Sequence, residues 1–308
     1  MPETEANCLV LHRKSANRPE VMAAVKAVQK AGLPLRVRVA WNKKDKARVV
    51  HEAVAAGATR IIAGGGDGTI NAVADALVGD AQAPPLAELG VMPLGTANDF
   101  ARGIGLPTKD LAECLRLACT LPAQAIDVGR LNRRSFINVA SLGFGAEVTA
   151  STPVPLKKAL GGGAYTLMGL ATAVKFTPYS GTITIPGREP IRGAMVIGAV
   201  GNNRFAGGGF DVAPKASLTD GLLDLAVLTH DESFTLFKVL EERKNPLGKG
   251  NQYLVYRQMP EFTLHWDRKL QCNLDGEPVR KKRMRFSVLP QWLPLAMPEP
   301  PPEEETDA

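Results

Sequence analysis

A glycine-rich turn at residues 64–69, with the sequence GGGDGT, constrains the fold of this chain more than any other segment. It follows an apolar run at residues 59–63 and precedes apolar residues at helical spacing from Ile70 to Leu77. At such a strand–turn–helix junction, glycines let backbone N–H groups approach phosphate oxygens, and the helix start favours negative charge. The chain lacks the GxxxxGK[ST] pattern of a P-loop. The turn therefore predicts a different phosphate cradle, with an ordinary tight turn as the alternative.

The first 125 residues alternate between strand-like and helix-like patterns, which predicts a doubly wound, parallel α/β sheet covered by helices on both faces. The expected strands are residues 7–12, 35–39, 59–63 and 88–92. The expected helices lie near residues 19–31, 50–57 and 70–77, and further helices start at about residue 96 and at residue 108. Residues 13–17 read as a loop.

After about residue 125 the pattern changes to short strands separated by Gly, Pro and Asn, which predicts a second, mainly β domain. The expected strands are residues 136–140, 182–185, 194–200, 222–228, 262–266, 271–274 and 285–289, with helices only near 160–174 and 232–243. We place the domains at 1–125 and 126–290, and the segment after about 290 is a candidate to pack back on the first. Residues 298–308 form a Pro/Glu-rich tail that we expect to be disordered.

The composition favours anionic partners without choosing among them. Lys and Arg number 37 against 31 Asp and Glu, a net charge of +6, which suits nucleotides, phospholipid surfaces or nucleic acid. No basic motif with interleaved aromatic residues supports nucleic-acid binding. The chain contains no run of about 18 apolar residues, no secretion-signal pattern and no CxxC pair among its four cysteines. We therefore expect a cytoplasmic protein with reduced thiols.

A second motif, PLGTANDFAR at residues 93–102, follows the next strand and therefore belongs at the same edge of the sheet. Gly95 has no Cβ, so the backbone there can approach a ligand closely. Thr96 is a candidate helix cap or nucleotide ligand. Asn98, Asp99 and Arg102 place polar groups on one helical turn. The alternative is a segment that only caps a helix.

A third motif, NLDGEP at residues 273–278, places two carboxylates on either side of a glycine. Asp275 and Glu277 at the end of a strand are suited to hold a metal or to act as a general base. The alternative is a plain β-turn, because Asp-Gly is a strong hairpin signal.

These three motifs, in this order, resemble those of the diacylglycerol-kinase-like lipid kinases, and most closely the bacterial YegS-type branch. The resemblance runs from about residue 8 to residue 295 and includes further matching segments, namely GNNR at 201–204, GGG at 207–209 and TDG at 219–221. GGDG alone also occurs in NAD kinases and phosphofructokinases, whereas PLGTANDFAR is much more specific. The resemblance implies an α/β domain, a β-sandwich domain and ATP in the cleft between them.

The resemblance also implies roles for individual residues. The nucleotide contacts fall on Ala40, Gly66, Asp67, Gly68, Thr69, Ile70, Asn71, Ala72 and Thr96. At Ala40 the relatives carry a Thr before the Trp, so a hydroxyl contact is lost here, and at Ala72 they often carry Glu. The proton acceptor falls on Glu277. A mainly structural Mg²⁺, or Ca²⁺ in its place, falls near Ser217, Asp220 and Leu222, two of which can serve through backbone carbonyls.

The chemistry of phosphoryl transfer suggests how such a site works. A lipid hydroxyl loses its proton to Glu277 as it attacks the γ-phosphate, and Asp67 and Asp275 are candidates for organising the catalytic Mg²⁺ or its waters. Five cations just past this turn suit a substrate held at the inner face of the membrane, with a solvated strand face as the alternative. They are Arg280, Lys281, Lys282, Arg283 and Arg285.

Two other functions remain open from the sequence, an NAD-kinase-like phosphotransferase and a non-catalytic nucleotide- or lipid-binding relative. PLGTANDFAR and the DGE turn argue against the first, and the intact GGDG and DGE segments argue against the second. Diacylglycerol, phosphatidylglycerol and a sphingoid base all stay open as the lipid acceptor.

Overall fold

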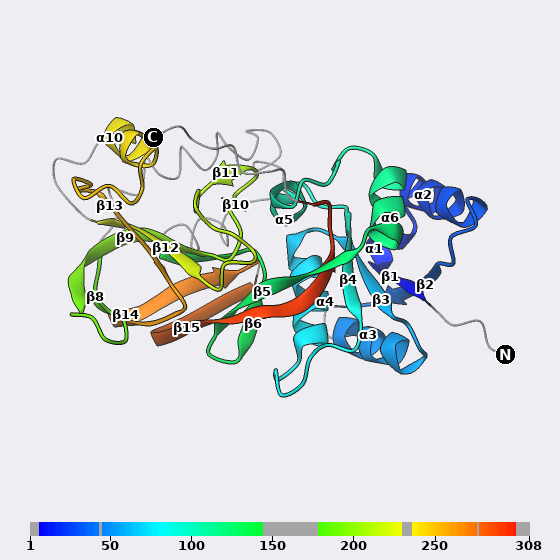
Figure 1. Cartoon of the computed structure of the whole chain (residues 1–308), viewed down its shortest axis with the longest axis horizontal. Coiled ribbons are helices and arrows are strands. Elements are labelled where there is room, and N and C mark those ends of the chain that lie inside the picture. The colour runs from blue at the N-terminus through cyan, green and yellow to red at the C-terminus, as the bar shows by residue number, and fades with distance from the viewer. Residues whose placement is uncertain (1–5, 43–44, 144–177, 230–235, 276, 300–308) are drawn as a thin grey trace.

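The computed structural model describes residues 6–42, 45–143, 178–229, 236–275 and 277–299. A part that combines strands with most of the helices forms one end of an elongated molecule, and a strand-rich part forms the other (Figure 1). The helix predicted at residues 160–174 lies outside the described residues, and so does nearly all of the predicted tail.

The N-terminal part is built on four parallel strands in the spatial order β2, β1, β3, β4. Their bounds are Asn7–His12 for β1, Arg36–Ala40 for β2, Arg60–Gly65 for β3 and Glu88–Pro93 for β4. β1 and β3 are almost entirely buried, as expected for strands of a parallel sheet with both faces covered. The predicted doubly wound α/β sheet is confirmed.

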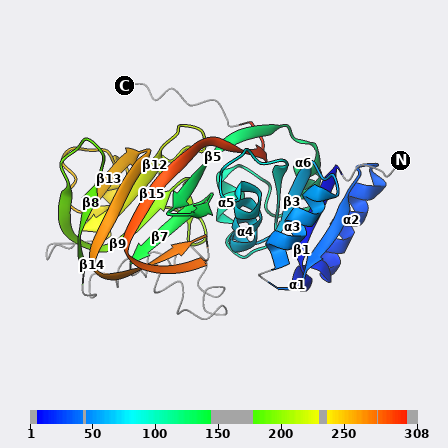
Figure 2. The same ribbon diagram turned by 90° about the horizontal axis from the view of Figure 1, so that it is seen from below.

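Helices cover both faces of this sheet (Figure 2). On one face, α2 (Pro19–Lys30) packs against α6 (Leu111–Thr120); on the other, α3 (Asp45–Ala55) packs against α4 (Asp67–Val78). Successive side chains of β1 point to opposite faces of the sheet, so they belong to two different cores. Leu9 and Leu11 pack in the α2/α6 core, and Cys8 and Val10 pack in the α3/α4 core.

Two local predictions in this part are wrong. The segment expected to be a loop contains a short helix, α1 (Arg13–Ala16), whose first turn is capped by the His12 side chain accepting from the N–H of Lys14 at 3.3 Å. The helix expected from about residue 96 begins only at Asp99, as α5 (Asp99–Gly103). Asn98 is its N-cap residue, in a left-handed conformation (φ 52°), and its Oδ1 accepts from the N–H of Gly95 at 2.8 Å. Thr96 therefore does not cap this helix.

The C-terminal part is mainly β. Its strands are β5 (Ala123–Leu131), β6 (Arg134–Phe136), β7 (Val139–Gly143), β8 (Tyr179–Thr184), β9 (Ile191–Gly201), β10 (Phe205–Ala206), β11 (Phe210–Asp211), β12 (Leu223–Thr229), β13 (Leu254–Met259), β14 (Glu261–Leu274) and β15 (Glu277–Ala296). In the described residues, the helix α10 (Leu236–Glu242) lies between β12 and β13. In the core of this part the ring of Phe262 stacks on that of Phe286, and the ring of Phe136 meets Phe286 edge to face.

The strand predictions for this part differ from the structure in three places. The segment at 136–140 is divided between β6 and β7, because the N–H groups of Ile137 and Asn138 donate to a side chain instead of a strand. The two strands expected at 262–266 and 271–274 are one strand, β14, with a register shift between His265 and Leu270. β5, β10, β11 and β13 were not predicted.

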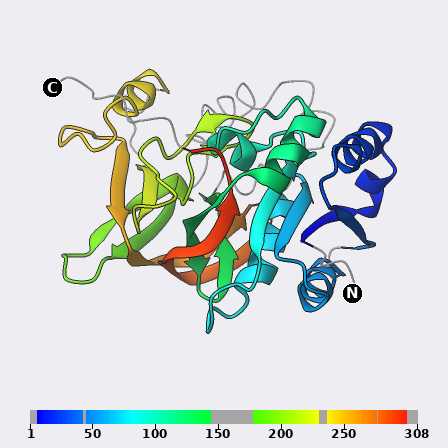
Figure 3. The same ribbon diagram turned by 45° about the vertical axis from the view of Figure 1, so that its right-hand side comes forward.

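The last strand, β15, connects the two parts of the molecule. It pairs antiparallel with β14 and β5, and Leu295 pairs parallel with Leu89 of β4. β15 therefore runs from the C-terminal strands to the edge of the parallel sheet (Figure 3), and the strands of both parts form one 13-stranded sheet.

Candidate active site

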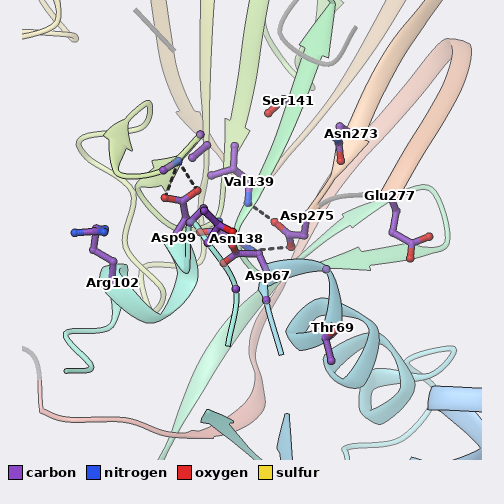
Figure 4. Close-up of a pocket in the computed structure, with 18 of the residues that line it drawn as sticks. Asp67, Thr69, Asp99, Arg102, Asn138, Val139, Ser141, Asn273, Asp275 and Glu277 are labelled. Carbon is purple, nitrogen blue, oxygen red and sulfur yellow. Dashed lines mark hydrogen bonds between the residues drawn. The ribbon is translucent and has the colours of Figure 1, made fainter. Parts of the chain in front are cut away.

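A cavity of about 760 Å³ opens where the carboxyl ends of β3 and β4 meet the C-terminal strands (Figure 4). Its volume is in the range of pockets that bind small molecules. The N-terminal part contributes Lys46, Gly66, Asp67, Gly68, Thr69, Gly95, Thr96, Ala97, Asp99 and Arg102. The C-terminal part contributes Asn138, Val139, Ser141, Ala206, Gly207, Gly208, Asn273, Asp275 and Glu277. All three motifs singled out in the sequence therefore line one cavity.

The first two motifs pack backbone against backbone. A Cβ atom on Gly95 would lie 2.7 Å from the Cα of Gly66, closer than any side chain tolerates. The N–H of Leu94 also donates to the carbonyl of Gly65 at 2.8 Å. The third motif approaches equally closely, because a Cβ on Gly68 would lie 3.1 Å from the carbonyl oxygen of Asp275. Glycine at these positions thus allows the three loops to form one surface.

Asp67 links the first motif to the second. Its Oδ1 accepts from the N–H of Phe100 in the first turn of α5 at 3.0 Å. The carboxylate thereby satisfies one of the helix's open donors, and it sits at the start of α4 where the helix end favours negative charge.

Asp99 links α5 to the glycine-rich loop of the C-terminal part. Its carboxylate accepts from the N–H of Gly208 at 2.9 Å and of Gly209 at 2.6 Å. Burial raises the pKa of this carboxyl; the backbone donors oppose that rise, and the negative charge of Asp67 adds to it. Asp99 therefore joins the two walls of the cavity.

Asp275 holds the segment between β6 and β7. Its Oδ2 accepts from the N–H groups of Ile137 (3.0 Å) and Asn138 (3.1 Å), and its Oδ1 accepts from Val139 (2.8 Å). Burial raises the pKa of Asp275 to about 7, against the effect of these three donors. The residue has a left-handed backbone (φ 46°) and follows Leu274, which pairs with Glu277 across the hairpin. The motif is therefore a hairpin turn and part of the cavity wall at once.

Glu277 begins β15 and is half-buried. It lines the main cavity and a second one of about 490 Å³, with Lys46 as the other shared residue. In Figure 4 its side chain extends away from Asp67 and Asp275. The remaining residues of the second cavity are Ala47, Asn71, Ala72, Asp75, Arg134, Ser135 and Leu274.

The predicted nucleotide ligands fall into three groups. Gly66, Asp67, Gly68, Thr69 and Thr96 line the main cavity. Asn71 and Ala72 line the second cavity. Ala40 and Ile70 are fully buried in the core, so their side chains face other side chains and only their backbones remain for a ligand.

The predicted metal residues lie on the loop before β12 and do not line either cavity. Asp220 Oδ1 accepts from the N–H of Leu222 at 2.9 Å, and Ser217 Oγ accepts from that of Thr219 at 3.3 Å. Within the described residues, no group of three or more His, Cys, Asp or Glu side chains is arranged to hold a metal. The hydroxyl, carboxylate and carbonyl oxygens of this loop are nevertheless the hard donors that Mg²⁺ and Ca²⁺ take.

Three residues important to this geometry were not identified from the sequence as site residues. Lys46 and Asn138 line the main cavity, and Asp127 accepts from the N–H groups of Gly221 (2.6 Å) and Gln291 (2.7 Å). None of these three residues lies in one of the three sequence motifs. The sequence alone therefore does not indicate that the fold brings them to the site. Asp127 connects the metal-candidate loop to the last strand.

A glycine-rich loop at the end of a parallel sheet, facing a carboxylate-bearing hairpin across a cavity, defines a phosphate-transferring class of enzyme. Residues 8–131 match the diacylglycerol kinase catalytic domain, and residues 138–297 match the YegS C-terminal NAD kinase beta sandwich-like domain. The chain is 44% identical over 291 residues to "Probable lipid kinase YegS-like" of Chromohalobacter salexigens, covering 94% of this chain and 93% of that one. The chain therefore belongs to the YegS-like lipid kinase family, and it is a kinase.

Two further comparisons agree with this family and its fold. A protein of the same name from Shewanella frigidimarina is 40% identical, covering 97% of this chain and 95% of its own. The crystal structure of a diacylglycerol kinase from Bacillus anthracis superposes with a TM-score of 0.73 at 19% identity, covering 97% of this chain and 99% of that one, which shows the shared fold. The predicted resemblance, the α/β-plus-sandwich fold and the enzyme class are confirmed. In the described part of the chain, no helix is both long and apolar enough to cross a membrane.

Proposed function

We propose that this kinase transfers the γ-phosphate of ATP to a hydroxyl group of a membrane lipid of the diacylglycerol or phosphatidylglycerol type. The observation that carries the proposal is the single cavity in which the GGGDGT loop, the PLGTAND loop and the DGE hairpin meet. The first two supply a phosphate cradle, and the third supplies a carboxylate across from it. The family name supports a lipid as acceptor.

In this proposal the phosphates of ATP lie on the glycine-rich loop. The N–H groups near Gly66 and Gly68 and the hydroxyls of Thr69 and Thr96 bind them. Mg²⁺ neutralises charge on the phosphates when bound, and Asp67 is the residue to hold it or its waters. Asp275 adds negative charge nearby, although both its oxygens already accept backbone hydrogen bonds. A second, structural Mg²⁺ or Ca²⁺ is assigned to Ser217, Asp220 and Leu222.

Glu277 is the proposed general base. It opens the strand that follows the hairpin and lines both cavities, so an acceptor hydroxyl placed between them lies within reach of its carboxylate. A base there has only to hold an ionised carboxylate at hydrogen-bond distance from the hydroxyl while the remaining groups align the phosphate.

The remaining proposals concern the setting of the reaction. We infer a cytoplasmic enzyme that binds the inner membrane surface when active, and we divide it into domains at residues 1–125 and 126–290. The exposed cations of β15 are the proposed membrane contact.

The test is a phosphorylation assay with the purified chain, radiolabelled ATP and Mg²⁺. Diacylglycerol, phosphatidylglycerol and sphingosine are offered in separate mixed vesicles, and NAD is offered in solution. We expect a labelled lipid and no labelled NAD. Glu277→Gln keeps the shape of the side chain but cannot take a proton, so kcat falls on the order of 10²–10⁴-fold with ATP affinity little changed.

Other results of this assay would replace the proposed function or the proposed role of Glu277. Labelled NAD without labelled lipid would replace the proposal with an NAD-kinase-like activity. ATP binding without transfer to any acceptor would indicate a non-catalytic relative. Near-normal turnover by Glu277→Gln would return that residue to the role of a structural turn.

A further inference from the structure

Lys46 is a buried cation between the two cavities. It is the second residue of α3, its exposed fraction is 7%, and it lines both the main and the second cavity. Lysine is among the residues least often buried this far, because removing an ammonium group from water is costly. Lys46 therefore places a positive charge at the boundary of the two cavities.

The side chain reaches the glycine-rich loop itself. Nζ of Lys46 donates to the hydroxyl of Thr69 at 3.2 Å, so the ammonium group lies beside the turn that begins α4. An ammonium group carries three donors and can donate to more than one oxygen at a time. A phosphate oxygen bound on the loop would therefore lie beside this ammonium group as well as beside Thr69.

The charges around the cavity single out Lys46. Four lining side chains are acidic, namely Asp67, Asp99, Asp275 and Glu277, and the described lining has two cations, Lys46 and Arg102. Arg102 lies beside Gly209, on the opposite side from Thr69 in Figure 4. Lys46 is therefore the cation at the phosphate-cradle end of the described lining.

The positive charge of Lys46 also acts on a neighbouring residue at the carboxyl edge of the sheet. Burial lowers the pKa of His12 at the end of β1, and the positive charge of Lys46 is the next contribution in the same direction. Ala40 ends β2 at this edge, and its side chain is buried. Lys46 enters the same region from the following helix, so it can supply a polar contact that Ala40 cannot.

We propose that Lys46 binds the β- and γ-phosphates of the nucleotide and makes this chain's phosphate site partly dependent on an ammonium group from α3. This inference rests on the proposed use of ATP and adds a phosphate ligand outside the three sequence motifs. Lysine is a common phosphate-binding residue that acts as a point charge.

The test measures nucleotide binding by calorimetry on the full chain with Mg²⁺ and without lipid, and then KM for ATP. Lys46→Met keeps the apolar stem and removes the charge, Lys46→Arg keeps a charge, and Arg48→Gln is the control on the exposed side of the same helix. Lys46→Met should weaken ATP binding about 10- to 100-fold, the range for a hydrogen bond to a charged group. AMP, which lacks the β- and γ-phosphates, should bind as to the wild type. Lys46→Arg should recover most of the loss, and Arg48→Gln should show none.

Several outcomes would overturn the inference. Wild-type ATP affinity and KM in Lys46→Met would remove Lys46 from the site, and an equal loss for ATP and AMP would make its role structural. If the wild-type chain binds ATP and phosphorylates lipid while Lys46→Met behaves identically, only this inference fails. If the wild-type chain binds no ATP, the proposed function fails and the inference with it. Should Lys46→Met unfold, Lys46→Gln serves in the same comparison, with thermal unfolding as the check on folding.

Discussion

Asp67, Asp99 and Asp275 each accept backbone N–H groups from a different segment, so the acidic side chains of the cavity also hold its walls together. Burial is the main cause that raises the pKa of both Asp99 and Asp275, and the negative charge of Asp67 adds to the rise in each. Each aspartate therefore has two separable roles, a hydrogen-bond acceptor and a negative charge. Substitution by Asn distinguishes them, because Asn keeps an acceptor oxygen and loses the charge.

The first prediction uses this distinction at Asp67. In Asp67→Asn the amide oxygen can still accept from Phe100, so the fold of the two loops should persist. Loss of the charge should lower phosphorylation by at least about 100-fold if the residue organises the metal, as expected for a group that stabilises charge in the transition state. The measurement is steady-state kinetics beside a thermal unfolding curve. An Asp67→Asn enzyme with wild-type turnover would leave this carboxylate only its structural role.

A second residue-scale prediction concerns pH and lies away from the cavity. Asp224 of β12 is fully buried, its Oδ1 accepts from the hydroxyl of Tyr256, and burial raises its pKa to about 6. The folded chain therefore keeps this proton to higher pH than the unfolded chain. Because the folded state binds more protons between about pH 4 and 6, the free energy of unfolding falls as the pH rises through that window.

The variant Asp224→Asn cannot titrate but can still accept from Tyr256, so it should remove this contribution of about 3 kcal/mol at most. Urea unfolding at pH 4.5 and at pH 7 measures the difference between the two proteins. Asp99, Asp220 and Asp275 contribute in the same direction in both proteins and do not affect the comparison. The exposed Asp267→Asn is the matched control. Equal pH slopes in wild type and Asp224→Asn would contradict the prediction.

Residue by residue, the motifs could be identified from the sequence but their partners could not. Gly66, Asp67 and Asp275 stand out because each lies in a short motif that combines glycine with a carboxylate directly after a predicted strand. Lys46 and Asp127 do not, because a lysine at a helix start and an aspartate within a strand are ordinary until the fold buries them. Long-range contacts such as Lys46 to Thr69 leave no local pattern.

At the scale of elements, the close approach of the first two motifs depends on glycine. Gly95 has no room for a side chain, because its Cβ would lie 2.7 Å from Gly66 Cα and 2.8 Å from Asn98 Oδ1. Asn98 needs that space, because its Oδ1 caps the turn before α5. The start of α5 is therefore coupled to the position of the glycine-rich loop.

Gly95→Ala should push the two loops apart. We expect a loss of stability of about 1–3 kcal/mol, the usual cost of overpacking, and a fall in kcat/KM for ATP of more than about tenfold, because the phosphate cradle loses its geometry. Gly193→Ala in β9 is the control, since its Cβ would meet nothing within 4 Å. Chemical unfolding and kinetics of both variants measure the effect. Wild-type behaviour of Gly95→Ala would show that the loops move apart without consequence.

Helices and strands could be predicted from the sequence where the periodicity of apolar residues is strong. β1 appears with the predicted bounds and α4 starts within three residues of prediction, because buried parallel strands and amphipathic helices leave clear patterns. Asn98 shows the limit: with its left-handed backbone and its side chain accepting from Gly95, α5 starts three residues later than predicted. The register shift that keeps β14 continuous is likewise set by its partner strands.

At the scale of the whole molecule, β15 carries three distinct features along one strand. It begins with Glu277 at the cavity, continues through the exposed Arg280, Lys281, Lys282 and Arg283, and ends beside β4 of the parallel sheet. Arg280 is three residues from Glu277, about 10 Å along an extended strand. A membrane surface bound by these four residues, the basic segment of β15, would therefore lie close to the proposed base, as an acceptor hydroxyl in a lipid requires.

The last prediction tests this segment. Replacing its four cations with Gln should weaken binding to vesicles that contain anionic lipid by at least about 100-fold at low salt, since each charge near such a surface contributes about 1 kcal/mol. Wild-type binding should weaken as salt is added. Turnover of a soluble short-chain lipid should change little, because the cavity residues are untouched.

The control removes four exposed cations, Lys26, Lys30, Arg36 and Lys109, from the N-terminal part, at the other end of the molecule in Figure 1. Vesicle cosedimentation across a salt series separates the two variants. Equal loss in both would mean that net charge alone drives binding, and no loss in either would leave the basic segment a solvated strand face.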